Sequence, residues 1–294
     1  KGSDKMKEKI KSFFAAIGCL IFAMLMQFIV GAVGGIILGI IYTVNAKNGS
    51  ESSAAYMDMQ GLQNFISSNM NIILILINVL IVIIFTVIYK VRKKNIKEEL
   101  QFRKTININI ILAIILGLSI CIFDSGVLAL IQEAGLLTEQ FAYTEEILSP
   151  ITNGNLILTI ISVVIVAPFA EEFLFRGIIY KTLNKNISVV WSIIIQALLF
   201  GVFHANLIQG AYATLMGILF GYATYKTKSL WPAIIMHITN NLSASLMPKI
   251  IQESILSTGV YIGFAVAGTI GIAVSTYIIR NKNVSVEENI ELEI

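Results

Sequence analysis

LILTIISVVIVAPFAEEFLFRGIIY, residues 156–180, is an apolar stretch interrupted by two adjacent glutamates, Glu171 and Glu172, and then by Arg176. A helix of this length, at 1.5 Å per residue, crosses a hydrocarbon core of about 30 Å. Ionisable side chains at membrane depth cost free energy, so they are rare and usually paired or functional. We therefore predict a transmembrane helix with a site at the level of these three residues.

The composition of the whole chain is typical of an integral membrane protein. Hydrophobic residues make up 56% of the chain and charged residues only 13%, a balance not found in soluble domains. Apolar segments near 20 residues recur without the alternation of barrel strands. We predict an all-α membrane protein, a bundle of about eight transmembrane helices. The expected spans are 13–42, 70–89, 106–131, 156–183, 188–205, 211–225, 230–246 and 255–279.

The distribution of lysine and arginine orients this bundle. With eight spans, one set of alternate segments carries 18 of the 21 basic residues: 1–11, 90–104, 181–187, 226–229 and 280–294. The opposite set carries only Lys47 and Lys249. Because basic loops stay in the cytoplasm, we predict that both termini are cytoplasmic.

The chain divides into four segments on this basis. Residues 1–11 form a cytoplasmic segment, 12–150 carry spans one to three, 151–250 carry spans four to seven as a candidate catalytic core, and 251–294 carry the last span and a cytoplasmic tail. Residues 43–68 and 132–154 are expected to be polar loops.

Phe123-Asp124-Ser125-Gly126 interrupts the third span with polar and small residues. We expect a helix break there, with Asp124 as a cap near the outer interface, rather than a functional role for this carboxylate.

The chain has only two histidines, His204 and His237, and both fall in apolar spans. A single intramembrane histidine is often a hydrogen-bonding residue that joins two helices. Two of them, together with a carboxylate pair on another span, favour a functional site.

Residues four apart share a face of a helix. Arg176 can therefore pair with Glu172 and leave Glu171 free for chemistry, while His237 and Asn241 can act together. The alternative for Glu172 and Arg176 is a purely structural ion pair. Neighbouring residues point about 100° apart on a helix, so Glu171 and Glu172 cannot have the same role.

The expected helix ends leave one conflict in this arrangement. They put Glu171, His204 and His237 at depths that differ by about 10 Å or more. Helix tilt, or a kink at Pro168, is needed to bring the three groups together.

Three ordered motifs carry a family resemblance: Glu-Glu-xxx-Arg at 171–176, Phe-xxx-His at 200–204 and His-xxx-Asn at 237–241. They resemble the CAAX protease and bacteriocin-processing family (CPBP or Abi), which includes Rce-type prenyl endopeptidases. The resemblance covers roughly residues 150–250, and residues 1–130 carry no motif of the family.

The resemblance implies a role for each matching residue. Glu171 would activate water together with His204, and His237 and Asn241 would stabilise the oxyanion. Glu172, Arg176 and Phe200 match supporting positions. Every motif residue is present, so we expect an active member of the family.

The same residue types fit peptide hydrolysis on chemical grounds. The reaction needs a base for water, a proton donor for the leaving amine and donors for the developing oxyanion. Glu171, His204 and His237 could instead bind zinc, but no His-Glu-xx-His arrangement is present. We expect no cofactor and no metal.

We therefore predict a glutamate-dependent intramembrane endopeptidase in a bacterial cell membrane. Its expected partners are the lipid bilayer and a membrane-associated or lipidated peptide or protein, such as a peptide precursor, and no nucleic acid. Two other functions remain open: a non-catalytic membrane scaffold that regulates a partner protein, and a proton-coupled transporter.

Overall fold

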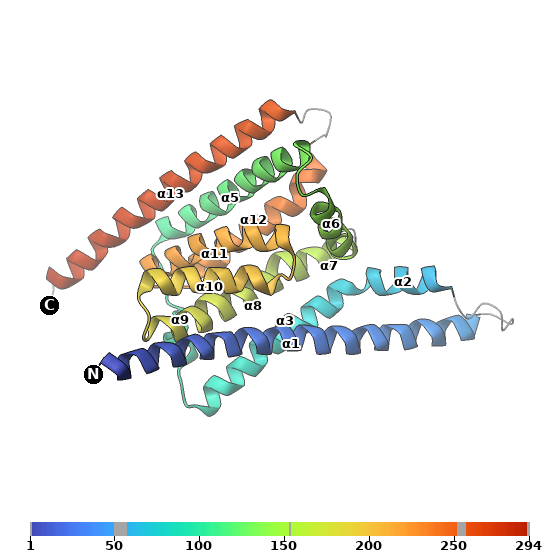
Figure 1. Ribbon diagram of the computed structural model, residues 1–294, viewed down its shortest axis with the longest axis horizontal. Helices are drawn as coiled ribbons and strands as arrows, with labels where there is room; N and C mark the ends of the chain where they lie inside the picture. The colour runs from blue at the N-terminus through green and yellow to red at the C-terminus, as the bar shows by residue number, and fades with distance from the viewer. Residues whose placement is uncertain (1, 50–57, 153, 252–256, 293–294) are drawn as a thin grey trace.

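The computed structural model describes residues 2–49, 58–152, 154–251 and 257–292, and it contains no strand within these ranges. Figure 1 shows the helices as a bundle. Six helical segments of the described chain are long and apolar enough to cross a membrane: Gly2–Asn45, Met70–Val91, Asn107–Glu133, Leu156–Asn184, Leu207–Thr227 and Thr258–Lys282. The protein is therefore an all-α, multi-pass membrane protein.

Each expected span corresponds to a helix or a continuous helical segment, with ends that differ by up to a few residues, and residues 255 and 256 of the last span lie outside the described residues. Single helices are α1 (Gly2–Gly49), α3 (Met70–Val91), α5 (Asn107–Glu133), α10 (Val189–Phe203), α11 (Leu207–Thr227), α12 (Trp231–Ile250) and α13 (Thr258–Leu292). Of these, α10 is apolar but only 15 residues long, and α12 carries two polar candidate residues, His237 and Asn241.

The fourth span is a composite of α-helical and π-helical segments. Its order is α7 (Leu156–Thr159), η2 (Ile160–Val166), α8 (Ala167–Glu172), η3 (Phe173–Ile179) and α9 (Tyr180–Asn184). The two π-helical segments therefore flank the short α-helix that carries both glutamates. π-Helical turns occur frequently at functional sites.

Helix pairs approach closely where one of them has a glycine. A side chain at Gly126 of α5 would lie 2.5 Å from the backbone of α13, and one at Gly268 would meet Phe123 of α5 at the same distance. In another helix pair, Gly217 of α11 lies directly against Ala197 of α10. Small residues at such crossings are typical of membrane helices.

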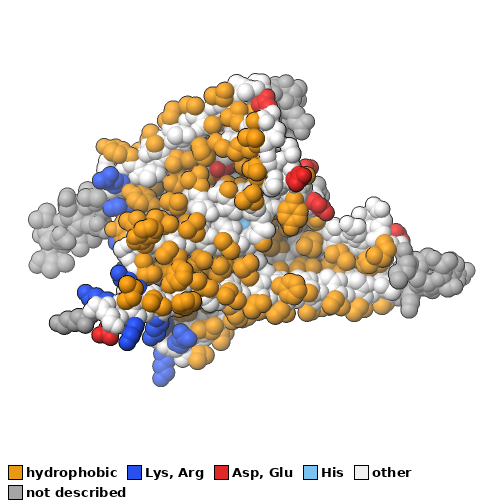
Figure 2. Space-filling view, viewed as in Figure 1, with side chains coloured by type: hydrophobic (Ala, Val, Ile, Leu, Met, Phe, Trp, Pro, Cys, Tyr) orange, Lys and Arg blue, Asp and Glu red, His pale blue; other side chains and the backbone are white. Residues whose placement is uncertain are grey.

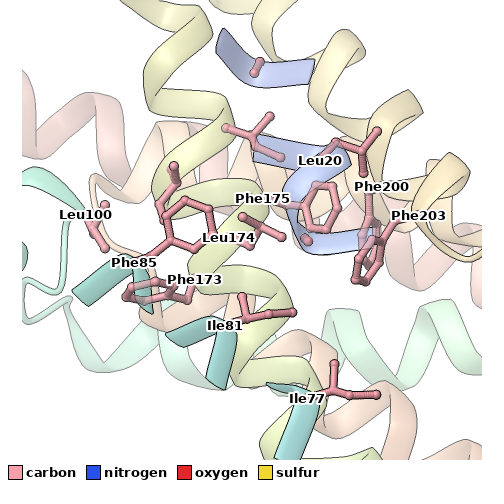
Figure 3. Close-up of a cluster of buried hydrophobic side chains, with 14 of the residues drawn as sticks. Leu20, Ile77, Ile81, Phe85, Leu100, Phe173, Leu174, Phe175, Phe200 and Phe203 are labelled. Carbon is pink, nitrogen blue, oxygen red and sulfur yellow. The ribbon is translucent and has the colours of Figure 1, made fainter. Parts of the chain in front are cut away.

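A buried apolar cluster holds the composite helix against α1, α3 and α10 (Figure 3). The segment η3 contributes Phe173, Leu174 and Phe175, which are at most 2% exposed. Many other large apolar side chains are exposed on the outside of the bundle, as contact with lipid requires (Figure 2).

The start of α1 and the end of α13 lie at the same end of the bundle (Figure 1). Lysines and arginines gather at this end in Figure 2. Which side of the membrane it faces stays a prediction.

Three local expectations from the sequence are wrong. Residues 43–68 contain the end of α1 and the helix α2 (Met59–Ser68), while residues 50–57 lie outside the described residues. Most of 132–154 forms the helix α6 (Thr138–Thr152). There is no break at 123–126, because α5 runs unbroken to Glu133; Asp124 therefore caps no helix. The short α4 (Ile96–Glu99) lies in the basic loop.

Candidate active site

Glu172 and Arg176 form an ion pair with no exposure to solvent. Arg176 Nη1 donates to Glu172 Oε1 at 2.8 Å, and both side chains are 0% exposed. The pairing expected from their spacing is therefore confirmed. The same Oε1 lies 2.9 Å from Nδ1 of His237 on α12. An ionised carboxylate only accepts, so Nδ1 carries a proton and a neutral His237 has its lone pair on Nε2.

Glu171 points in a different direction from Glu172, as expected of neighbours on a helix. Its Oε2 lies 3.7 Å from His237 Nε2, and its side chain is 14% exposed. This separation is too long for a direct hydrogen bond. Glu171 is thus adjacent to His237 and open to the cavity described below, while Glu172 holds the other side of the same imidazole ring.

Phe200 of α10 is the common neighbour of both histidines. Its ring centroid lies 4.9 Å from that of His204 and 5.9 Å from that of His237. The guanidinium carbon of Arg176 lies 4.4 Å from the same ring, a cation–π arrangement. The side chains from α10 and α12 therefore meet, although the helices begin and end within a few residues of the expected positions. The conflict of about 10 Å came from treating these helices as untilted and as starting at the same depth.

His204 is held by its own helix. Its Nδ1 lies 2.9 Å from the carbonyl oxygen of Phe200. Because a carbonyl oxygen only accepts, Nδ1 is the protonated nitrogen, and Nε2 of a neutral His204 is free to take a proton.

Asn241 binds the backbone of the composite helix. Its Nδ2 donates to the carbonyl oxygen of Val163 at 2.9 Å, and its Oδ1 accepts from Asn240 at 3.1 Å. In this π-helical turn Ala167 N–H donates to Ser162 O. The next backbone hydrogen bond of this turn would run from the N–H of residue 168 to Val163 O, but Pro168 has no N–H. Asn241 therefore supplies the donor that the proline lacks.

A cavity of about 750 Å³ opens beside these groups. Among the residues that line it are five of the candidates: Glu171, Phe200, His204, His237 and Asn241. Glu172 and Arg176 do not line it. The cavity extends to Leu148 and Ile151 of α6, the helix at the end of the bundle opposite the chain ends (Figure 1).

The donor set does not fit a metal centre in this geometry. In the described part of the chain, no three His, Cys, Asp or Glu side chains are placed to hold one metal ion. This includes Glu171, His204 and His237, the residues that could have formed a zinc site.

The sequence did not identify Phe220, whose ring lies 5.3 Å from His237 and 5.2 Å from the Arg176 guanidinium. Its position between Gly217 and Gly221, two small residues on a helix-packing face, was the available signal. Val163 could not have been found, because its part in the site is a backbone carbonyl.

Comparisons with known proteins agree with the motifs. Residues 153–243 match the family model described as Type II CAAX prenyl endopeptidase Rce1-like. A protein of Bacillus subtilis (strain 168), "Putative membrane peptidase YdiL", is 30% identical over 138 residues, which are 47% of this chain and 56% of the relative. The match thus spans little more than half of the relative's length. No solved structure matches the chain.

Proposed function

We propose that this chain is an intramembrane endopeptidase, because residues 153–243 match the Rce1-like family model and part of the chain is similar to a putative membrane peptidase. Its substrate would be a membrane-associated or lipidated peptide or protein. One observation supports the proposal most directly: Glu171, His204, His237 and Asn241, from three spans, line one cavity inside a membrane bundle.

In the proposed reaction Glu171 is the general base. It takes a proton from a water molecule in the cavity, and the resulting hydroxide attacks the carbonyl carbon of the peptide bond. The proton then passes to the leaving amine, either from Glu171 or through His204, whose Nε2 is free. The network of Glu172 and Arg176 has a supporting role, because it holds His237 without lining the cavity.

Asn241 and His237 are the proposed oxyanion donors. An amide nitrogen has two hydrogens, so Asn241 can bind Val163 with one and the oxyanion with the other. His237 becomes a donor toward the cavity when Nε2 is protonated. Two such donors stabilise the charge that develops in the transition state.

Replacement of the base tests the proposal. We expect Glu171→Gln to lower cleavage by the full chain in liposomes by about 10²–10⁴-fold, and Glu139→Gln on the exposed face of α6 to leave it unchanged. A membrane-peptide library read by mass spectrometry supplies the substrates. Cleavage by Glu171→Gln at the wild-type rate would refute the role of Glu171. A chelator is expected to have no effect, since the proposed steps use no metal.

A further inference from the structure

Asp124 is a membrane-embedded carboxylate that the proposed reaction does not use. Its neighbours in sequence pack on α13: Phe123 lies against Gly268, and Gly126 lies against Tyr261. Asp124 itself lines the cavity, together with Glu171. Since α5 continues unbroken past this position, the carboxylate has no capping role that would explain it.

No positive charge compensates Asp124 within the described residues. It forms no hydrogen bond or ion pair there, and no lysine or arginine lines the cavity. The arginine of the candidate site, Arg176, is fully buried in its ion pair with Glu172. A carboxylate at membrane depth is costly without a partner, so a cation that enters the cavity would stabilise the ionised form of Asp124.

The wall around Asp124 is suited to a polar ligand. Ser125, Gln209 and Tyr212 line the same cavity, and their side chains carry hydroxyl and amide groups that can hydrogen-bond. Pockets that bind a ligand specifically combine an apolar lining with a few such groups.

The end of the bundle toward which the cavity extends is acidic. The exposed side of α6 carries Glu139, Glu145 and Glu146. Asp58, just before α2, and Glu133, at the end of α5, are further exposed acidic residues at this end. A field of this sign attracts cations and raises their local concentration near the cavity.

We propose that Asp124 binds a positively charged group of the substrate, so that the enzyme selects cationic peptides. The group is a Lys or Arg side chain, or a free N-terminal ammonium, close to the bond that is cleaved. The inference rests on the proposed function for the peptide nature of the ligand. It adds a specificity residue on α5, outside the segment that carries the family motifs.

The test uses the full chain in phosphatidylcholine liposomes, whose neutral lipid does not itself concentrate cations. The probes are sets of otherwise identical peptides with Lys, Arg, Gln or norleucine at each position in turn. Each peptide is made with a free and with an acetylated N-terminus, which separates the side-chain from the terminal ammonium. Cleavage is compared between wild type, Asp124→Asn and the control Glu145→Gln.

We expect the wild type to prefer one cationic position over its Gln counterpart by on the order of tenfold in kcat/KM, carried mainly by KM. Asp124→Asn should reduce this preference to about twofold or less. The variant should unfold at the same thermal midpoint as the wild type. Glu145→Gln should keep the preference. If Asp124→Asn fails to fold, Asp124→Ser takes its place.

A preference that persists without the Asp124 charge overturns the inference, and so does the absence of any preference in the wild type. A measurement of peptide binding distinguishes failure of this inference from failure of the proposed function. Fluorescent Lys and Gln peptides are titrated into Glu171→Gln and into Glu171→Gln with Asp124→Asn. If nothing is cleaved but Lys-peptide binding still depends on Asp124, the protease proposal fails and the cation site stands.

Discussion

A single carboxylate oxygen, Glu172 Oε1, joins two helices of the site. It accepts from Arg176 on its own composite helix and from His237 on α12. The ring of His237 is thereby fixed, with Nε2 directed toward Glu171. Each of the paired charges is buried at 0% exposure, so neither can be removed without leaving the other uncompensated.

Loss of the Arg176 charge should therefore destabilise the protein strongly. We expect Arg176→Gln to lower the free energy of unfolding by about 3–5 kcal/mol, measured by denaturation in mixed micelles. The matched control is Arg280→Gln, an exposed arginine on α13, for which we expect a change of about 0.5 kcal/mol or less. Equal stability of Arg176→Gln and wild type would show that the pair is energetically neutral.

The sequence predicted the contacts within one helix and missed those between helices. The spacing of Glu172 and Arg176 was sufficient to predict their pairing. The bond from Glu172 to His237, and that from Asn241 to Val163, depend on where two helices cross. No periodicity in either helix contains that information, and the roles of the individual residues stay predictions.

At the scale of elements, the composite fourth span determines how the glutamates are presented. A π-helical segment precedes α8 and another follows it. Pro168 leaves one carbonyl without a backbone donor, and a side chain from α12 occupies it. The local defect in one helix is thus completed by another, which couples the positions of α8 and α12.

This coupling predicts a rescue. Asn241→Ala should cost about 1–3 kcal/mol of stability, because the Val163 carbonyl becomes an unsatisfied buried acceptor. Adding Pro168→Ala supplies a backbone N–H at residue 168 and should recover most of that loss. The measurement is a double-mutant cycle of unfolding free energies. Simple additivity of the two substitutions would contradict the capping role of Asn241.

Helix existence was easier to predict from the sequence than helix boundaries or interruptions. Hydrophobic length predicted a helix at each of the eight expected positions, because a backbone in lipid must satisfy its hydrogen bonds internally. Six of these helical segments are long and apolar enough to cross a membrane. The expected break at Asp124 was wrong because glycine and serine in a membrane helix serve packing as well as termination. Gly126, in contact with α13, is an example.

At the scale of the whole molecule, the bundle is electrically polarised. Lysine and arginine gather where both chain ends lie (Figure 2), and α6 with its exposed glutamates lies at the other end. The cavity extends toward the acidic end. If the basic end is cytoplasmic, as the positive-inside rule predicts, the substrate reaches Glu171 from the outer side.

Thiol labelling of intact cells checks this orientation. A membrane-impermeant reagent should label Glu145→Cys on α6 directly. Lys9→Cys and Arg280→Cys, near the two chain ends, should react only after permeabilisation. The unsubstituted chain gives the background from Cys19 and Cys121. Labelling of the two terminal positions from outside would reverse the orientation.

The composite helix also has a consequence for how this sequence can change over generations. Lipid-facing positions in η2 can exchange one apolar residue for another, since the bilayer distinguishes little between them. The number of residues in this segment is more restricted than their identity. Inserting or deleting one residue between Val163 and Glu171 turns everything beyond it by about 100°, which moves the carboxylate off the cavity wall. We therefore expect this segment to tolerate substitutions but not insertions or deletions.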